Sequence, residues 1–133
     1  MYLIDTNIFL EILLEQEKSK ECEALLKKIR NSSFLFYVSS FTLHSIEVIM
    51  IRNNKVNELM GFLSDVIVSK IIRIDTNSDD EINSVKAMKE LKLDFDDSIQ
   101  FYVCKKYNLK IISFDKHFDR TQVKRLAPGE VKL

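Results

Sequence analysis

The chain has 133 residues, of which 46% are hydrophobic and 30% charged, a balance typical of one globular domain and not of a disordered segment. Only two glycines and one proline argue against a flexible linker or a turn-rich all-β fold. Twenty lysines and arginines balance twenty aspartates and glutamates, so any affinity for nucleic acid must come from local clustering of basic residues. We therefore expect a single domain over residues 1–133.

The cysteines and the hydropathy pattern exclude several other classes. Cys22 and Cys104 lie in apolar helical patterns without the spacing of zinc ligands, which predicts buried free thiols. No apolar run reaches the ~18 residues of a membrane span, and no basic segment precedes an apolar one at the start of the chain. We expect a cytoplasmic protein without membrane contact.

The first half of the chain predicts two strands and four helices. Short apolar runs indicate strands, whereas apolar residues that recur every three or four positions indicate helices. In chain order we expect a strand at 2–4, helices at 9–14 and 22–29, a strand at 34–38, and helices at 41–52 and 56–66.

The second half continues the alternation. We expect a strand at 70–74, a helix at 78–91 that begins with a capping box of Ser78 and Glu81, a helix at 94–103, a strand at 109–112 and a short strand within 123–126. Strands that alternate with helices need crossover connections, which favour parallel pairing. The predicted fold is therefore α/β: a three-layer α/β/α sandwich with a mostly parallel sheet of four to five strands.

Aspartates follow three of the predicted strands. Asp5, Asp75 and Asp115 stand at strand ends, and ligands of open parallel sheets bind outside the carboxyl ends of the strands. Each aspartate also fits a purely local role as a helix cap or turn residue. Their shared position makes them candidates for one site.

Glu47 interrupts an apolar helical stripe. Leu43, Ile46 and Met50 occupy the same face as Glu47, and a buried carboxylate must be protonated, paired with a cation or bound to a metal. Apolar residues also cover much of the remaining helix surface, so a solvated side for Glu47 is the alternative reading.

A further acidic cluster opens the helix at 94–103. Asp94 and Asp97 are three positions apart and share one side of the helix start, whereas Asp96 is expected to point elsewhere. The helix dipole alone also favours acids there. Several carboxylates gathered in one cleft repel one another and need a hard cation, for which Mg²⁺ or Mn²⁺ with oxygen ligands is suited.

Four segments together resemble the PIN-domain nucleases, and they span nearly the whole chain. These are residues 1–7, 40–50 with Glu47, 94–99 and 112–118. The resemblance implies a Mg²⁺- or Mn²⁺-dependent endoribonuclease of the VapC-like kind, the toxin of a toxin–antitoxin pair. The sequence departs from the family's commonest pattern at Ser98, Ser113 and His117.

The family's functional residues carry over onto matching positions. The resemblance implies an acidic quartet of Asp5, Glu47, Asp97 and Asp115, with Asp94 as a supporting carboxylate and Thr6, Asn7 and Ser113 as polar neighbours. One ion held by Asp5 and Asp97, with a second near Glu47 and Asp115, would activate a water and stabilise charge on the scissile phosphate.

Substrate binding needs positive charge beside this acidic site. Residues 105–133 contain eight lysines and arginines, and Lys116 and Arg120 flank Asp115 closely enough to meet backbone phosphates. Phe118 could stack on an unpaired base of RNA. The alternative is that these basic residues are solvated surface side chains.

Three other functions compete with a toxin nuclease. They are a receiver-like regulatory domain, which leaves Glu47 without a role, a non-catalytic PIN-like scaffold, and an RNA-processing nuclease without an antitoxin. The unusually apolar helices at 41–52 and 56–66 predict a pairing surface. We expect a homodimer there, with the helix of a small antitoxin as the alternative occupant.

Overall fold

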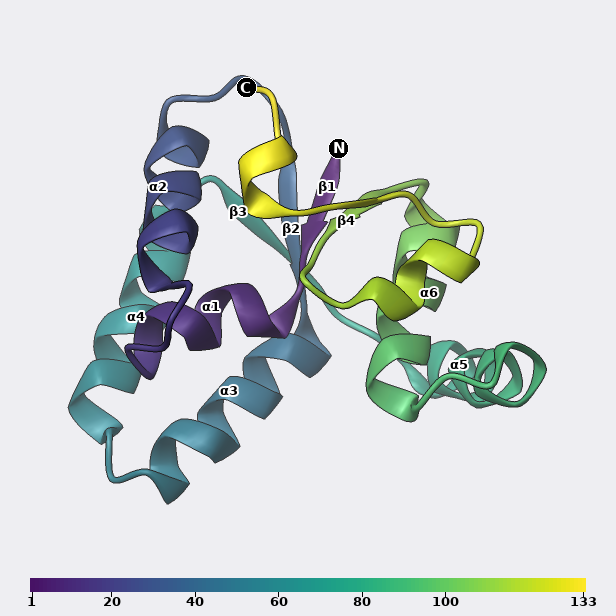
Figure 1. Ribbon diagram of the computed structural model, residues 1–133. Coiled ribbons are helices and arrows are strands. Elements are labelled where there is room, and N and C mark those ends of the chain that lie inside the picture. The colour runs from purple at the N-terminus through teal and green to yellow at the C-terminus, as the bar shows by residue number, and fades with distance from the viewer.

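A five-stranded parallel sheet lies between two layers of helices in the computed structural model, which describes residues 1–133 (Figure 1). The strand order is β3-β2-β1-β4-β5. The strands are β1 (Tyr2–Ile4), β2 (Phe36–Ser39), β3 (Ile71–Ile74), β4 (Lys110–Ile112) and β5 (Arg125–Leu126). The predicted three-layer α/β/α fold with a parallel sheet is confirmed.

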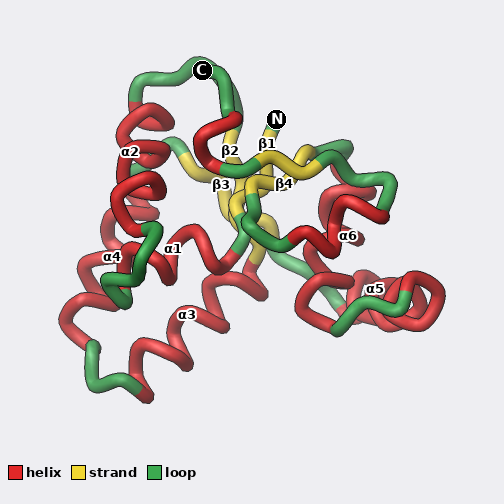
Figure 2. The backbone as a smooth tube through the Cα atoms, viewed as in Figure 1, coloured by secondary structure: helices red, strands yellow, loops and turns green.

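Four helices cover one face of the sheet and two cover the other (Figures 1 and 2). The first layer contains α1 (Thr6–Leu13), α2 (Ser19–Arg30), α3 (Ser40–Arg52) and α4 (Val56–Val68), and the second contains α5 (Ser78–Leu91) and α6 (Phe95–Tyr107). Two short 3₁₀ helices follow, η1 (Lys116–Arg120) and η2 (Pro128–Glu130). None of the helices has both the length and the hydropathy needed to span a bilayer.

The sheet divides the apolar core into two clusters. The larger cluster packs under α1 to α4 and includes Phe9, Phe36 and Met50, and the smaller one packs under α6 and η1. Cys22 is buried in the larger cluster and Cys104 in the smaller, and both are free thiols. This confirms the prediction for both cysteines.

Two local predictions need correction. The capping box of α5 is formed by Asn77 and Asp80, because Asn77 has the extended backbone of an N-cap and Ser78 is already the first helical residue. Phe118 is fully buried in the smaller core cluster and cannot stack on an RNA base. The buried ring of Phe118 instead anchors the polar segment around it to the core.

Strand order decides which strand ends meet. β1 pairs with β4, which places Asp5 beside the residues that follow β4. β2 separates β1 from β3, and Asp75 lies at the exposed end of β3, paired with Arg73 at 2.7 Å. Asp75 therefore does not join Asp5 and Asp115, contrary to the expectation from strand ends alone.

We predict that Phe118→Ala lowers the free energy of unfolding by about 3–5 kcal/mol, because it removes a fully buried ring and leaves a cavity under η1. Urea titration followed by circular dichroism measures the change. Phe34→Ala is the matched control, since Phe34 is 46% exposed. A cost for Phe118→Ala no larger than that for Phe34→Ala would contradict a core role.

Candidate metal centre

Asp5 lies at the end of β1 and caps α1. Its Oδ1 accepts a hydrogen bond from the Thr6 backbone N–H at 2.9 Å, and its Oδ2 accepts one from Ser113 Oγ at 2.6 Å. The side chain is nearly enclosed, and burial raises the pKa of Asp5, with the nearby charge of Asp115 adding to the effect. Residues that follow the neighbouring strands β1 and β4 thus hold the Asp5 carboxylate in place.

Asp97 enters the same site from the first turn of α6. Asp94 caps this helix and accepts a hydrogen bond from the Asp97 N–H at 2.9 Å. Burial, together with the charges of Asp115 and Asp94, raises the pKa of Asp97 to about 7. The structure therefore holds an Asp97 carboxyl that loses its proton far less readily than a free aspartate.

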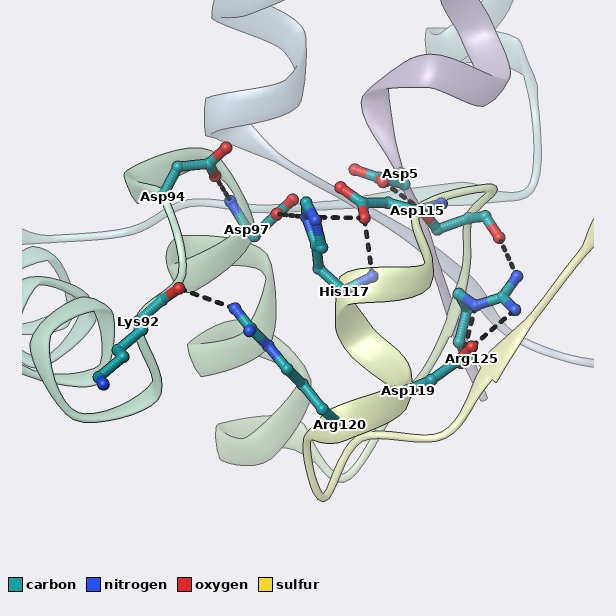
Figure 3. Close-up of polar contacts among 10 residues, drawn as sticks. Asp5, Lys92, Asp94, Asp97, Asp115, His117, Asp119, Arg120 and Arg125 are labelled. Carbon is teal, nitrogen blue, oxygen red and sulfur yellow. Dashed lines mark hydrogen bonds and ion pairs between the residues drawn. The ribbon is translucent and has the colours of Figure 1, made fainter.

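Asp115 follows β4 and caps η1. Its Oδ1 accepts a hydrogen bond from the His117 backbone N–H at 2.8 Å, and its own N–H donates to Ser113 Oγ at 2.9 Å. The ring Nδ1 of His117 lies 3.1 Å from Asp115 Oδ1 and 3.3 Å from Asp97 Oδ2 (Figure 3). Asp97, Asp115 and His117 together form a group that could hold a metal ion.

A buried amide lies behind the carboxylates. Gln100 of α6 is 1% exposed, and its Nε2 donates to Asp5 Oδ1 at 3.1 Å and to Thr42 Oγ1 at 2.8 Å. Its Oε1 accepts from Ser39 Oγ at 2.7 Å. Gln100 was not among the predicted site residues; the available signal was a polar residue inside the otherwise apolar stretch from Ile99 to Val103.

A cleft of about 550 Å³ opens in front of these residues. It is lined by acids from three places in the chain, and no lysine or arginine lines it; the acids are Asp5, Asp94, Asp96, Asp97 and Asp115. Asp96 was expected to point elsewhere but lines the cleft, and burial beside Asp94 raises its pKa. Residues on more than one side of the first turn of α6 therefore line the cleft.

Glu47 does not line this cleft. Helix α3 presents Phe41, His44, Ser45, Val48 and Ile49 to it, and residue 47 is turned about 130° from the centre of that face at 100° per residue. The Glu47 side chain makes no hydrogen bond or ion pair. The structure therefore does not bring Glu47 together with the three aspartates, and Ser45 is among the residues that α3 presents to the cleft.

The remaining predicted residues divide into two groups. Thr6 and Asn7 line the cleft, and Ser113 is buried between Asp5 and Asp115. Lys116 and Arg120 are exposed on η1 outside the cleft, and Arg120 Nη2 donates to the Lys92 carbonyl at 2.7 Å (Figure 3). Their part in substrate binding stays a prediction.

The donor set fits a divalent cation. Oxygen ligands from converging carboxylates suit Mg²⁺ or Mn²⁺, and a cation relieves the repulsion between Asp97 and Asp115 that the raised pKa of Asp97 records. No lysine or arginine lines the cleft to supply that charge. Asp97, Asp115 and His117 form the group that could hold a metal, and Asp5 lines the same cleft beside them.

The fold gathers aspartates at the carboxyl ends of the strands of a parallel sheet, where open α/β sheets bind ligands. The sequence pattern of the PIN domain matches residues 2–124 of this chain. The chain belongs to the PIN domain family. No curated protein matches it in sequence.

Several solved structures share this fold at low identity. A toxin–antitoxin complex from Klebsiella pneumoniae has a TM-score of 0.72 and 20% identity, covering 98% of this chain and 100% of its own. VapC20 of Mycobacterium tuberculosis, a toxin that cleaves the sarcin–ricin loop, has a TM-score of 0.80 and 14% identity, and the match covers 96% of this chain and 100% of VapC20. VapBC2 of Rickettsia felis, bound to a fragment of promoter DNA, has a TM-score of 0.75 and 15% identity, and the match covers 95% of this chain and 97% of that chain.

The raised pKa of Asp97 predicts a pH dependence of stability in metal-free protein. The pKa of Asp97 is about 7 in the folded state and about 3.9 in the unfolded state. Between these two pH values the folded protein binds a proton that the unfolded chain has lost. The stability that this proton contributes is therefore fully present below pH 4 and is lost as the pH rises through 7. We expect Asp97→Asn to remove this loss and to be more stable than the wild type at pH 8 by on the order of 2 kcal/mol, allowing for solvent screening.

Urea unfolding in EDTA at acidic and alkaline pH measures this difference. Asp75→Asn is the control, because Asp75 lies outside the cleft and is exposed. Equal pH profiles for wild type and Asp97→Asn would contradict the electrostatic account of the site.

Proposed function

We propose that this chain is a divalent-metal-dependent endoribonuclease that hydrolyses RNA phosphodiester bonds. The observation that carries the proposal is the convergence of Asp5, Asp97 and Asp115, from β1, α6 and the end of β4, in a cleft without lysine or arginine. Such a cleft repels phosphate unless a cation is bound. Membership of the PIN domain family supports the same reading.

Asp5, Asp97 and Asp115 would hold Mg²⁺ or Mn²⁺ and must be charged to do so. When bound, the metal supplies an activated water and stabilises the negative charge that develops on the phosphate. Asp94 supports Asp97 by capping α6, and Ser113 orients Asp5 through its hydroxyl. The carboxylates hold metal and are not nucleophiles.

RNA is the proposed substrate, and phosphate contacts come from basic residues outside the cleft. Lys116 and Arg120 lie on η1, which Asp115 caps, so an RNA backbone that reaches the aspartates passes close to η1. The similarity in fold to a toxin that cleaves the sarcin–ricin loop supports RNA over other phosphodiesters. A cytoplasmic location stays a prediction.

We predict that purified protein cuts a labelled structured RNA with Mg²⁺ or Mn²⁺ and does not cut it in EDTA. Asp5→Asn, Asp97→Asn and Asp115→Asn each remove a charged metal ligand and are expected to lower the cleavage rate roughly 10²–10³-fold. Gel analysis of the cleavage products under single-turnover conditions measures the rate.

Glu47→Gln is the matched control and is expected to keep wild-type activity, because Glu47 does not line the cleft. Circular dichroism and melting curves establish that every variant is folded. If Glu47→Gln loses metal-dependent cleavage and Asp115→Asn keeps it, the active site lies outside this cleft. A folded wild type that cuts no RNA with either metal would favour the non-catalytic scaffold.

We further propose that the chain is the toxin of a toxin–antitoxin pair, with the antitoxin bound in an apolar groove. The groove of about 300 Å³ lies between α1, α2 and α4, and its lining includes Ile12, Leu26, Phe62 and Val66. An amphipathic helix fits a groove of this kind. The toxin–antitoxin complexes among the similar structures support this partner over an antitoxin-free processing nuclease.

A leucine in place of Gly61 is predicted to block the groove without harming the fold. Gly61 lies on α4 in the groove wall, and a Cβ there meets no atom within 4 Å. Gly61→Leu should raise stability by about 0.5–1 kcal/mol through helix propensity. It should also abolish the inhibition of RNA cleavage by a small protein that binds the wild-type chain.

Pull-downs by tagged wild type and Gly61→Leu, with inhibition assays of the small protein that the wild type captures, provide the measurement. Equal inhibition of both forms would show that the antitoxin binds elsewhere. A homodimer through α3 and α4 stays a prediction; both helices expose apolar side chains, among them Ile51, Met60, Ile67 and Val68.

A further inference from the structure

His117 is held in place beside the acidic group by the loop that carries it. Its backbone N–H donates to Asp115 Oδ1 at 2.8 Å, and the next residue, Phe118, is fully buried. Arg125 ties η1 to β4 by pairing with Asp119 at 2.9 Å and donating to the Ser113 carbonyl at 3.0 Å. The histidine backbone is therefore anchored to the sheet, although the ring itself is 64% exposed.

The Nδ1 atom of His117 lies at a distance from the two carboxylates that suits a ligand of a shared metal ion. In octahedral coordination with bonds of about 2.1 Å, adjacent ligand atoms are about 3.0 Å apart. His117 Nδ1 lies 3.1 Å from Asp115 Oδ1 and 3.3 Å from Asp97 Oδ2, and the three donor atoms lie within 4.8 Å of one another (Figure 3). An ion that contacts both carboxylates is therefore within reach of the imidazole.

The other histidine of the chain differs in this respect. His44 lines the cleft from α3, but its side chain makes no hydrogen bond or ion pair with a carboxylate. His117 lies beside the cleft, and of the two histidines only His117 belongs to the cluster of donor atoms. His44 is thus an internal control for any signal that arises from a histidine near the metal.

We propose that His117 is a nitrogen ligand of the metal ion that Asp97 and Asp115 hold, and that it shifts the preference of the site from Mg²⁺ towards Mn²⁺. The inference rests on the metal centre of the proposed function. Mg²⁺ strongly prefers oxygen ligands, whereas imidazole binds the transition metals better. The competing role for His117 is that of a cationic partner of the two carboxylates, which a metal would displace.

Pulsed EPR of bound Mn²⁺ tests the proposal directly, because a coordinated imidazole gives ¹⁴N modulation of the electron spin echo. We expect this modulation in wild type and His44→Ala and its loss in His117→Ala. Competition titrations should also show that His117→Ala weakens Mn²⁺ binding about tenfold more than Mg²⁺ binding. His117→Asp, with an oxygen ligand in place of nitrogen, should keep an ion, lose the modulation and favour Mg²⁺.

The possible failures are distinguishable. The ligand role of His117 is overturned if bound Mn²⁺ shows no ¹⁴N modulation in wild type, or if the modulation persists in His117→Ala. Either result leaves the nuclease proposal standing. If wild type binds no Mn²⁺, as judged by the free-ion EPR signal, the metal centre and the role of His117 both fall. The measurement uses the full chain and needs no RNA substrate.

Discussion

Repulsion between carboxylates held in one cleft is the constraint on which the structure of this site depends. Asp5 and Asp97 are both nearly enclosed, and the charges of neighbouring aspartates add to the effect of burial in raising the pKa of each. A folded protein keeps such an arrangement only if other interactions fix each carboxylate. Three of the aspartates are fixed by capping helices: Asp5 caps α1, Asp94 caps α6 and Asp115 caps η1. The same side chains thus begin helices and border the cleft.

The second support is a buried polar network beneath the cleft. Gln100 joins Asp5 to Ser39 and Thr42, so one amide of α6 links the ends of β1 and β2 with the start of α3. No buried side-chain polar atom lacks a partner. A fully satisfied network of this kind is rigid, because each group is costly to leave unpaired in the interior. The carboxylates are therefore positioned by the core of the sandwich as well as by loops.

Helix α1 separates the two surfaces to which we assign functions. Thr6 and Leu10 face the acidic cleft, whereas Phe9, Ile12 and Leu13 face the apolar groove. A partner in the groove therefore packs on the helix whose first turn is capped by Asp5. The arrangement would keep the proposed nucleic-acid chemistry and the proposed partner recognition on different sides of one short element.

Much of the fold followed from local patterns in the sequence. The alternation of apolar runs and helical stripes predicted the parallel α/β/α sandwich, and the positions of Asp5 and Asp115 after strands predicted that they would meet. Asp75 has the same local pattern as Asp5, with Ile-Asp-Thr-Asn at both places, but strand order places β2 between their strands. Local sequence reports that a strand ends and cannot report which strand lies next to it.

The composition of the site depended on tertiary packing. Periodicity correctly placed Leu43, Ile46 and Met50 on the buried face of α3, but it could not tell which flank of the helix faces the cleft, so it selected Glu47 where the structure presents Ser45. Gln100 and His117 acquired their roles from partners far away in the chain, such as Asp5 and Asp97. The sequence by itself determined the elements and the acidic strand ends, because these depend on neighbours a few residues away. The packing of distant elements decided which side chains converge, because that depends on how helices and strands are rotated against one another.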